Sequence, residues 1–499
     1  MNLSTILDMA AEAFGDRVGV VCGDTRLTYA ELRQKAYAAA RELQGSGARH
    51  LALLDVNSPA APVAIFAAAY AGIAYVPINY RLTPDEINEL VGRVAPAVLV
   101  ASDETRAQLD ARDEIRVISR EQFLSLPTDA AAEPPTPPED PRAVAVQLFT
   151  SGTTGKPKAA ILRHENLMAY IVGTVEFGCA EEDDASLVSV PPYHIAGISS
   201  VLSSTYACRR MVQLESFDAK TWVDAATREQ VSNAFVVPTM LSRIVEHLDE
   251  SAVQLPSLRS LAYGGGKMPQ ATIANAMRLL PRVDFTNAYG LTETSSTIAV
   301  LGPDDHRAAA ASPDGHVQRR LCSVGRATGA VEIQIRDDDG RPVAANAAGL
   351  VFVRGGQVSG EYLQQGSLLD GEGWFSTRDR GWLDDAGYLF LDGRADDVIV
   401  RGGENISPGE IEDVLLEHPS VADAAVVAVP DEQWGEGVGA AVVLKPEARA
   451  SVDELQALVK SRLRSSRVPQ RIVFRDALPY NETGKVLRRV IRQEMAAAS

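Results

Sequence analysis

Residues 148–158 read Leu-Phe-Thr-Ser-Gly-Thr-Thr-Gly-Lys-Pro-Lys, and the first two of them end an apolar run at 143–149 that is typical of a β-strand. Gly152 and Gly155 leave out side chains where backbone N–H groups must approach an anion. Hydroxyl donors and positive charges surround these glycines: Thr150, Ser151, Thr153, Thr154, Lys156 and Lys158. A strand that ends in such a composition predicts a loop that wraps phosphate groups.

This loop departs from the best-known phosphate loop. A Walker A loop requires Gly-x-x-x-x-Gly-Lys-Ser/Thr, in which the hydroxyl residue contacts Mg²⁺. Here Thr150 stands where the first glycine belongs, and Pro157 replaces the Ser or Thr. The run is therefore not a Walker loop. Taken alone it is also compatible with a flexible polar surface loop, so the rest of the chain has to decide between the two interpretations.

Length and charge set limits on the class of protein. The chain has 499 residues, which exceeds one hydrophobic core and predicts several domains. Lys plus Arg number 48 and Asp plus Glu number 66, so the net charge is −18. This balance opposes binding to nucleic acid or to anionic membranes through charge alone. A phosphate site must build its positive potential locally, which gives weight to lysines beside glycines.

The cysteines and the apolar segments indicate the compartment. Four scattered cysteines without metal-ligand spacing are typical of reduced thiols in a cytoplasmic protein, and the seven histidines form no visible cluster. The N-terminus lacks a basic region followed by an apolar one, so no signal peptide is expected. The most apolar segment, 62–77, is shorter than the roughly 20 residues of a spanning helix. We expect a buried helix followed by a strand there.

Helix and strand patterns alternate over the first hundred residues. Thr28 is a good N-cap, and Glu31 three residues later completes a capping box for a helix that ends before Gly45. Apolar strands are expected at 51–56 and 97–101, with a further helix and strand between them. This alternation predicts a doubly wound α/β region with a parallel sheet.

Further short strands lead to polar or glycine-rich loops. A proline-rich connector at 129–141 delivers the chain to the phosphate loop. A strand at 188–190 precedes Pro191-Pro-Tyr-His194, and a strand at 260–263 ends in Gly264-Gly-Gly-Lys-Met-Pro269.

The last hundred residues are typical of a separate α+β unit. Strands are expected at 424–429 and 439–444, and helices at 409–416 and 453–464. Near the end, Asn481-Glu-Thr-Gly-Lys485 presents one lysine on a glycine turn.

Five motifs, in the same order and at similar spacing, resemble those of the acyl/aryl-CoA synthetases in the adenylate-forming (ANL) superfamily. They are Thr150-Ser-Gly-Thr-Thr-Gly-Lys-Pro-Lys158, Tyr289-Gly-Leu-Thr-Glu293, Thr377-Arg-Asp379, Gly393-Arg-Ala-Asp-Asp397 and Asn481-Glu-Thr-Gly-Lys485. The resemblance covers essentially the whole chain. It implies an α/β fold with a large N-terminal domain of doubly wound sheets, 1–395. A small mobile α+β lid domain, 396–499, would follow, with the hinge at Asp396.

The resemblance also implies a nucleotide site. The phosphate loop would bind ATP through Thr150, Ser151, Gly152, Thr153, Thr154, Gly155 and Lys156. The adenine would lie against Gly264, Gly265, Gly266, Asn287, Ala288, Tyr289 and Gly290. Asp379 and Arg394 would contact the ribose, Thr292 the α-phosphate, and Glu293 would hold Mg²⁺ as a hard oxygen ligand. Lys485 would bridge the carboxylate oxygen and the α-phosphate.

Several of these positions carry a second interpretation. The family places an aromatic residue or His at His194, between acyl pocket and thiol entry, whereas a lone His is usually structural. Thr292 is also a candidate helix cap, and the three glycines after 263 also suit a plain strand-to-helix turn. Lys267 suits either a substrate partner or an exposed surface lysine. Arg378 replaces the glycine of most relatives and leaves the local turn geometry open.

The acid is only broadly constrained. Its expected wall is small and apolar, which suits an aliphatic or aryl chain: Ile195, Ala196, Gly197, Gly264, Gly265, Gly266 and Ala288. No arginine stands out to pair with a second carboxylate, so a dicarboxylate is disfavoured.

The implied reaction has two steps. A carboxylate attacks the α-phosphate of ATP to give an acyl-adenylate and pyrophosphate, and a thiolate then displaces AMP. Positioning and charge stabilisation would dominate both steps. The CoA path would be lined by Gly402, Gly403, Glu404 and Trp434. The expected cofactors are ATP, Mg²⁺ and coenzyme A, and the expected partner is a small carboxylic acid.

Alternatives remain within and outside this family. A peptide-synthetase adenylation module is expected to continue into a carrier domain after Ser499, and a fatty acyl-AMP ligase to carry an insertion that is not seen. A luciferase-type oxygenase and a stand-alone enzyme that loads a carrier-protein thiol stay open. A non-catalytic nucleotide-binding protein is disfavoured because both Glu293 and Lys485 are retained. Neither nucleic acid nor an integral membrane segment is expected, and the oligomeric state is open, a homodimer included.

Overall fold

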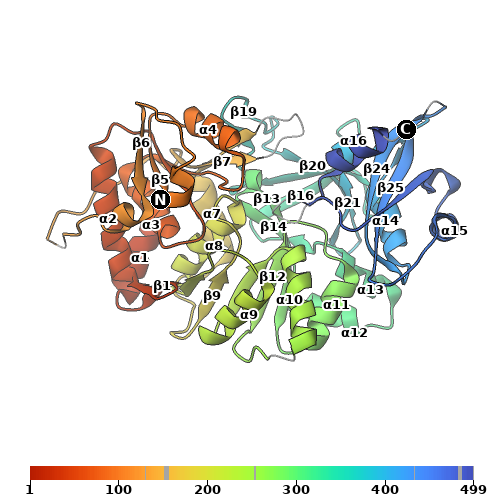
Figure 1. The fold of residues 1–499 in the computed structure, drawn as a ribbon, viewed down its shortest axis with the longest axis horizontal. Coiled ribbons are helices and arrows are strands. Elements are labelled where there is room, and N and C mark those ends of the chain that lie inside the picture. Colours follow the sequence, from red (N-terminus) through yellow and green to blue (C-terminus); the bar gives the residue numbers. More distant parts are fainter. Residues whose placement is uncertain (130, 151–156, 252–253, 432, 481–485, 498–499) are drawn as a thin grey trace. The chain divides into compact units, whose positions relative to one another are not determined.

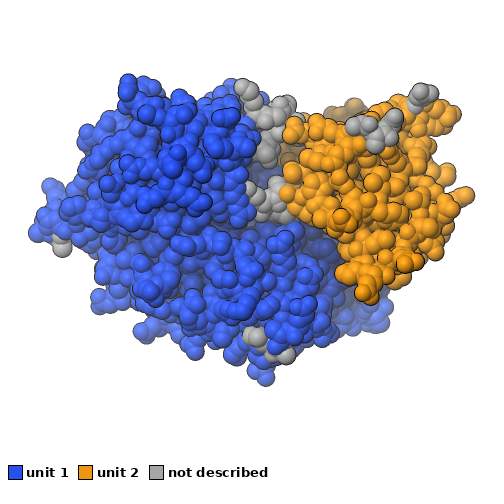
Figure 2. All heavy atoms as spheres, in the orientation of Figure 1, with its two compact units in different colours: residues 1–332, 353–375 blue, residues 333–352, 376–499 orange. Residues whose placement is uncertain are grey.

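The computed structural model of the chain describes residues 1–129, 131–150, 157–251, 254–431, 433–480 and 486–497. Its internal contacts define two compact units, which Figure 2 shows in blue and orange. Unit 1 comprises Met1–Glu332 and Val353–Phe375, and unit 2 comprises Ile333–Phe352 and Ser376–Ser499. Residues 376–395 thus pack with the segment predicted to be the lid, and the predicted domain boundary at Asp396 falls inside unit 2. The hinge at Asp396, about which the lid would rotate, stays a prediction.

The N-terminal helices are α1 (Ser4–Phe14), α2 (Tyr29–Gln44) and α3 (Ala60–Ala71). The last two form where the sequence signals lie, whereas α1 was not predicted. The capping box before α2 is confirmed, since the Glu31 N–H donates to Thr28 Oγ1 at 3.2 Å and the Thr28 N–H to Glu31 Oε2 at 2.8 Å. The apolar segment at 62–77 is a buried helix, α3, followed by a strand, as predicted. Within the described ranges, no helix is long and apolar enough to cross a membrane.

The first sheet of unit 1 is the predicted parallel α/β sheet with an antiparallel extension. In spatial order its strands are β19 (Gly366–Ser367), β18 (Glu361–Tyr362), β8 (Lys158–Arg163), β7 (Val144–Thr150), β4 (Ala74–Pro77), β3 (His50–Leu54), β5 (Ala97–Ala101) and β6 (Ile115–Ser119). The five strands from β7 to β6 run parallel. Its connecting helices are α4 (Pro84–Arg93), α5 (Asp103–Arg106) and α6 (Arg120–Leu124).

The second sheet of unit 1 carries the later motifs. In spatial order its strands are β15 (Arg326–Ala327), β14 (Ser296–Leu301), β13 (Asp284–Leu291), β12 (Ser260–Gly264), β11 (Asn233–Val236), β9 (Ala185–Val188), β10 (Arg210–Gln213), β1 (Val18–Cys22) and β2 (Thr25–Thr28). The helices of this half are α7 (His164–Thr174), α8 (Ile195–Tyr206), α9 (Ala219–Arg228), α10 (Pro238–Ser251), α11 (Gln270–Leu279), α12 (Pro303–Ala311) and α13 (Gly315–Gln318).

The strand predicted at 188–190 is wrong in its bounds. The strand is β9, Ala185–Val188, and it ends where the prediction begins. The Asn57 amide donates to the carbonyls of Val188 (3.4 Å) and Val190 (3.1 Å). The side chain of Asn57 therefore provides the hydrogen bond that the Val190 carbonyl needs. Residues 188–190 can be buried without a neighbouring strand at Val190.

A helical layer joins the two sheets of unit 1. One continuous core contains buried side chains from α1, α2, α3, α7 and α8 together with residues of both sheets. A second core lies on the other side of the nine-stranded sheet, against α9, α10 and α11, which Figure 1 shows in green. Unit 1 is thus layered, with helices between and outside its sheets, as a doubly wound fold requires.

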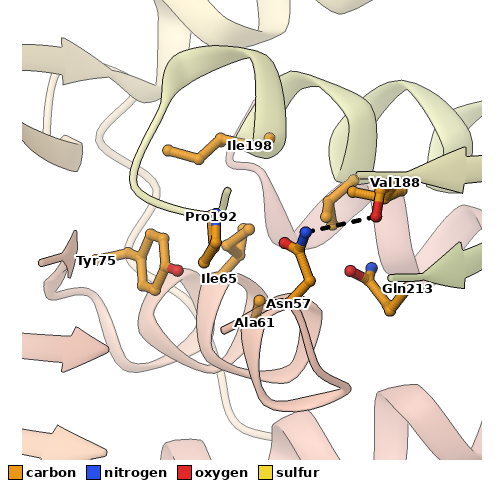
Figure 3. A pocket seen from close by; sticks show the side chains of 10 residues that line it. Asn57, Ala61, Ile65, Tyr75, Val188, Pro192, Ile198 and Gln213 are labelled. Atoms are coloured by element: carbon orange, nitrogen blue, oxygen red, sulfur yellow. Dashed lines mark hydrogen bonds between the residues drawn. The ribbon is translucent and has the colours of Figure 1, made fainter. Parts of the chain in front are cut away.

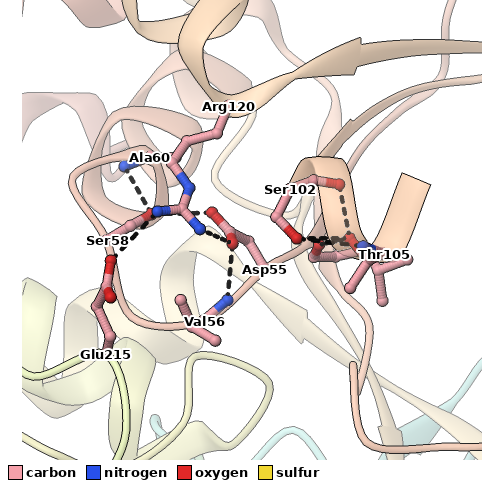
Figure 4. Close-up of polar contacts among 9 residues, drawn as sticks. Asp55, Val56, Ser58, Ala60, Ser102, Thr105, Arg120 and Glu215 are labelled. Atoms are coloured by element: carbon pink, nitrogen blue, oxygen red, sulfur yellow. Dashed lines mark hydrogen bonds and ion pairs between the residues drawn. The ribbon is translucent and has the colours of Figure 1, made fainter. Parts of the chain in front are cut away.

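A buried ion pair holds the end of β3. The Asp55 carboxylate is buried and accepts from Arg120 at 2.6 Å and from the Ser58 hydroxyl at 3.1 Å (Figure 4). Arg120 also reaches Glu215 at 3.2 Å, so it links the start of α6 to the loop after β10. Burial raises the pKa of Asp55 above its ordinary value, although Arg120 opposes this shift. The carboxylate oxygens of Asp55 already bind these internal partners, which indicates a structural role.

Two further sheets contain the remaining strands, whose residues belong mostly to unit 2. The first consists of β16 (Val331–Arg336), β17 (Gly349–Gly355), β20 (Phe375–Leu383) and β21 (Leu389–Arg394). The second consists of β23 (Glu404–Ile406), β22 (Ile399–Arg401), β25 (Gly435–Leu444) and β24 (Val421–Asp431), with β26 (Arg471–Arg475) parallel to β25. Its helices are α14 (Pro408–Leu416), α15 (Val452–Arg462) and α16 (Arg488–Ala497). The α+β class predicted for the last hundred residues is confirmed.

Candidate functional site

The predicted phosphate loop joins two paired strands. Thr150 ends β7 and Lys158 begins β8, and the two residues are register partners. Thr150 Oγ1 donates to the Lys158 carbonyl at 3.4 Å, and Arg93 of α4 donates to the Pro157 carbonyl at 2.8 Å. The loop therefore begins and ends at fixed points of the eight-stranded sheet. Its predicted ligands Ser151, Gly152, Thr153, Thr154, Gly155 and Lys156 lie outside the described residues.

Two predicted nucleotide motifs lie on neighbouring strands. Gly264 ends β12 and pairs with Ala288 of β13, so the glycine turn and the Asn287–Gly290 run are brought together. A Cβ at Gly264 would lie 2.1 Å from the Ala288 carbonyl oxygen, a distance that no side chain tolerates. Close strand contact therefore requires this glycine. Gly265 (φ 83°), Gly266 and Lys267 follow as an exposed turn.

Asn287 is partly committed to the fold. Its Nδ2 donates to the Ser323 carbonyl at 3.1 Å, and the side chain is buried. A contact between this amide and adenine, as predicted, would use Oδ1 or the second N–H of Nδ2. The predicted partners Ala288, Tyr289 and Gly290 continue along β13, and a Cβ at Gly290 would lie 1.9 Å from the Ser296 carbonyl oxygen.

The metal candidate lies in a sharp reversal of the chain. Thr292–Thr294 form one turn of 3₁₀ helix, and Ser295 (φ 55°) and Ser296 (φ 114°) then turn the chain into β14. The helix-cap interpretation of Thr292 is wrong, because Thr292 is the first residue of this short turn and Leu291 precedes it as the cap. The reversal places Glu293 in a buried position, where its carboxylate must have partners.

A tyrosine that the sequence motifs did not include supplies one such partner. The Tyr362 hydroxyl donates to Glu293 Oε1, and the Lys158 ammonium lies 5.7 Å from the centre of the Tyr362 ring. The N–H groups of Ser359 and Gly360 donate to the Glu293 carbonyl at 2.9 and 3.0 Å. The aromatic residue two positions after Gly360 was the available signal, but a two-residue strand is too short to recognise by periodicity.

His194 lies at the start of α8. Its carbonyl accepts from the Gly197 N–H at 3.0 Å, and its ring packs 4.5 Å from that of Tyr193, measured between centres. Burial, assisted by the charge of Arg81, lowers the pKa of His194 to about 4. Its Nε2 is buried and makes no hydrogen bond among the described residues. A neutral ring with an unsatisfied nitrogen suits a residue that lines a ligand site.

A narrow pocket lies behind the start of α8, on the side of α3. Figure 3 shows the side chains that line it, among them Tyr75, Asn57, Gln213, Pro192 and Ile198. The space is too small for a water molecule. Of the predicted acid wall, Ile195, Ala196, Gly264, Gly265, Gly266 and Ala288 do not line this pocket, and only Gly197 does. The pocket therefore shares only Gly197 with the predicted acid wall, which stays a prediction.

The two predicted ribose contacts are adjacent in unit 2. Asp379 of β20 and Arg394 of β21 are register partners, and Arg394 Nη1 donates to Asp379 Oδ1 at 3.0 Å. Thr377 supports the pair, because its Oγ1 accepts from the Asp379 N–H at 3.1 Å and donates to the Val351 carbonyl at 2.9 Å. The structure therefore brings these two predicted site residues together.

Arg378 lies beside this pair and contacts the predicted hinge. Its φ is 63°, a left-handed conformation that favours glycine. Its guanidinium donates to Asp396 Oδ1 at 3.1 Å. The next residue, Asp397, pairs with Arg488 of α16 at 3.5 Å. Two consecutive carboxylates are thus held by arginines that lie on opposite sides of them in the sequence.

The predicted CoA-path residues form one turn. Gly402 (φ 57°) and Gly403 (φ 85°) connect β22 to β23, and the Gly402 N–H donates to the Trp434 carbonyl at 3.0 Å. A Cβ at Gly402 would lie 2.6 Å from the Trp434 ring, so glycine lets the ring cover the turn. Glu404 pairs with Arg467, whose hydrogen bond lowers the pKa of Glu404. Arg467 was not identified from the sequence.

Lys485, the predicted catalytic lysine, lies outside the described residues. The chain on both sides of it is well anchored. Tyr480 forms a β-bridge with Val486 and donates through its hydroxyl to Asp423 Oδ2 at 2.6 Å. Arg488 donates to the buried Glu412 and to the Val426 carbonyl.

Comparisons with known proteins agree with these motifs. Residues 7–363 match the profile of the AMP-binding enzyme family, and residues 410–485 match the AMP-binding enzyme C-terminal domain. The chain is 32% identical to an indoleacetate–CoA ligase of Aromatoleum aromaticum over 99% of its own length and 98% of that protein. It is 34% identical to a feruloyl-CoA synthase of an Amycolatopsis species, with 94% of each chain covered.

A solved structure agrees over the whole length. The o-succinylbenzoate CoA synthetase of Bacillus subtilis, solved with its acyl-adenylate intermediate, superimposes with a TM-score of 0.83 at 27% identity. The superposition covers 98% of this chain and 97% of that one.

Proposed function

Because the chain belongs to the AMP-binding enzyme family and is an ATP-dependent, AMP-forming carboxylic acid–CoA ligase, we propose that its acid is an aryl or arylalkyl monocarboxylate. Two similar proteins are named for indoleacetate and ferulate, both aromatic acids. The small apolar residues expected around the acid suit a flat ring or an alkyl chain. Fatty acids are the second class to test.

The reaction proceeds through an acyl-adenylate. A carboxylate oxygen forms a bond to the α-phosphorus of ATP while the bond to the β-phosphate oxygen breaks and pyrophosphate leaves. The CoA sulfur then bonds to the acyl carbon, the bond to the AMP oxygen breaks and AMP leaves. The first step needs no general base, because the acid is already ionised at neutral pH. The protein's task is to align the reactants and to stabilise moving charge.

Three side chains would carry most of this task. Lys485 would bridge the attacking carboxylate and the α-phosphate, and Thr292 would contact that phosphate. His194, kept neutral by burial, would line the space between acid and thiol without adding charge. Asp379 and Arg394 would fix the ribose from their paired strands.

Glu293 would hold Mg²⁺ together with ATP. In the described ranges no cluster of three or more His, Cys, Asp or Glu side chains suits a metal ion. Mg²⁺ commonly binds one or two carboxylates and completes its shell with water and substrate phosphates, so a single buried carboxylate fits it. The bound ion would neutralise the β- and γ-phosphates and so make pyrophosphate a better leaving group.

The observation that supports this assignment most directly is the link between two distant motifs. Lys158, which closes the predicted phosphate loop, lies over the ring of Tyr362, and the hydroxyl of that tyrosine binds Glu293. The loop and the candidate metal ligand are therefore within one side chain of each other, although 135 positions separate Lys158 from Glu293 in the sequence.

A pyrophosphate-release screen tests the proposed acid class. Purified protein with MgATP should release pyrophosphate with aryl and arylalkyl acids, and the acid-dependent rate should rise when CoA is added. Similar rates with fatty acids of all lengths and none with aryl acids would contradict the proposal. Replacing CoA by a phosphopantetheinylated carrier protein in the same assay tests the open alternative that a carrier thiol is the acceptor.

The cysteines support a proposal about the cellular compartment of the protein. All four cysteines are free in the structure, and we propose that the protein works in the reducing cytoplasm.

A further inference from the structure

Tyr362 lies on a strand whose position is fixed at several points. The two-residue strand β18 pairs antiparallel with β8, so that Tyr362 lies opposite Ala160 and Glu361 opposite Ile161. Arg163, also on β8, donates to both oxygens of Glu361 at 2.9 and 2.7 Å. A bidentate arginine pair adds geometric specificity to the strand register. The backbone that carries Tyr362 is therefore held by the same sheet that carries the phosphate loop.

The segment before Tyr362 and the side chain of Tyr362 both contact Glu293. The backbone N–H groups of Ser359 and Gly360 donate to the Glu293 carbonyl, and the Tyr362 hydroxyl donates to Glu293 Oε1. Gln357 extends this contact, because its amide donates to the carbonyls of Thr294 at 3.0 Å and Thr297 at 2.8 Å. Hydrogen bonds from residues 357–362 thus hold the chain reversal that contains Glu293.

We propose that Tyr362 is a positioning residue for the metal that ATP brings to Glu293. Its hydroxyl occupies Oε1 and fixes the plane of the carboxylate, which leaves Oε2 for Mg²⁺. A carboxylate held by a donor loses little rotamer freedom when the metal binds, so the metal binds more tightly. This inference rests on the proposed role of Glu293.

The phenol also connects the two parts of the phosphate site. The ring lies under the Lys158 ammonium at a distance suited to a cation–π contact. Lys158 and Glu293 are thereby connected through one rigid ring. The hydroxyl and the ring have separable functions, and Tyr362→Phe removes only the first.

The test compares Tyr362→Phe with wild type in a Mg²⁺ titration of pyrophosphate release. We expect the Mg²⁺ concentration for half-maximal rate to rise roughly 10- to 100-fold, the scale of losing a group that orients a metal ligand. The KM for the acid at saturating Mg²⁺ should stay unchanged. An unchanged Mg²⁺ requirement would overturn the proposal, and so would a lower one, because it would mean that the phenol competes with the metal.

A second readout does not depend on turnover. ATP should raise the thermal unfolding midpoint of wild type in a Mg²⁺-dependent manner, and Tyr362→Phe should need more Mg²⁺ for the same rise. Tyr37→Phe is the matched control, since it removes a phenol–carboxylate bond of 3.0 Å to Asp8 far from the site. It should leave the Mg²⁺ dependence as in wild type.

Glu293→Gln separates this proposal from the one it rests on. If that variant keeps the wild-type Mg²⁺ requirement, Glu293 does not hold the metal and both proposals fail. If Glu293→Gln raises the requirement while Tyr362→Phe does not, only the positioning role is overturned.

Discussion

Two histidines show how burial, as the main cause, sets the charge of a residue. His164 is fully buried, and its Nδ1 accepts from the Leu3 N–H at 3.2 Å, which requires an unprotonated nitrogen. Burial lowers the pKa of His164 to about 4, as it does for His194. Both rings are therefore neutral at physiological pH. The sequence gives no sign of this, because burial depends on packing from distant elements.

These two shifts predict a pH dependence of stability. Between pH 4 and about 6.5 the unfolded chain binds protons at both histidines and the folded protein does not, so the free energy of unfolding rises with pH in this window. Above about pH 6.5 their contribution is constant. Each histidine adds a slope of at most about 1.4 kcal/mol per pH unit. Urea unfolding of wild type and His164→Gln from pH 4.5 to 7.5 should show a shallower rise in the variant.

Lys485 is predicted to act in one half-reaction only. Lys485→Ala should slow adenylate formation by about 10²- to 10³-fold, the scale of losing a charge partner in the transition state. Thioester formation from supplied acyl-adenylate and CoA should be retained. Rapid-quench measurement of each half-reaction checks this, and an equal loss in both would mean that the lysine has another role.

At the scale of elements, local signals were predictable and long-range ones were not. The capping box of Thr28 and Glu31 lies within four residues, and the helix begins where it predicts. β18 has two residues and pairs with β8, about 200 positions earlier, so neither periodicity nor caps indicate it. The end of β9 was missed for the same reason, because it depends on the amide of Asn57.

The β20–β21 hairpin gives a prediction about backbone strain. Arg378 adopts φ 63°, a conformation that destabilises a non-glycine residue by about 1 kcal/mol. Its exposed ion pair with Asp396 stabilises the fold by at most about 1 kcal/mol. Arg378→Ala keeps the strain and loses the pair, whereas Arg378→Gly relieves the strain. We expect Arg378→Gly to be more stable than Arg378→Ala by roughly 1 kcal/mol in urea unfolding. Equal stabilities would mean that the turn is unstrained.

For the whole molecule, the family motifs predicted the two-part architecture but not which contacts hold it. Unit 2 includes the β20–β21 hairpin, because the Ser407 hydroxyl donates to the Asp392 carbonyl at 2.5 Å and residues 408–416 pack on β21. Such contacts lie between segments that no single motif covers. The acid pocket is unpredictable for the same reason, since its depth depends on side chains from several elements.

A pivot at Asp396 remains the prediction for how one enzyme serves two steps. Proline fixes φ near −65° and should restrict rotation there. Asp396→Pro should keep adenylate formation and lose most CoA transfer, while the control Asp396→Ala loses the carboxylate but keeps a free backbone. Separate assays of the two half-reactions check this. Full CoA transfer in the proline variant would place the pivot elsewhere.

The two arginines that pair with Asp396 and Asp397 differ in their contact with water. Arg378 and Asp396 have side chains 58% and 29% exposed, whereas Arg488 is 20% exposed and also binds the buried Glu412. Dissolved ions weaken exposed pairs first, since the Debye length falls from about 10 Å at 0.1 M salt to about 3 Å at 1 M. Raising the ionic strength should therefore weaken the Arg378–Asp396 pair before the Arg488–Asp397 pair. Raising NaCl should shift the ratio of the two half-reaction rates in wild type and much less in Arg378→Gly, so that salt alone would change which half-reaction limits turnover.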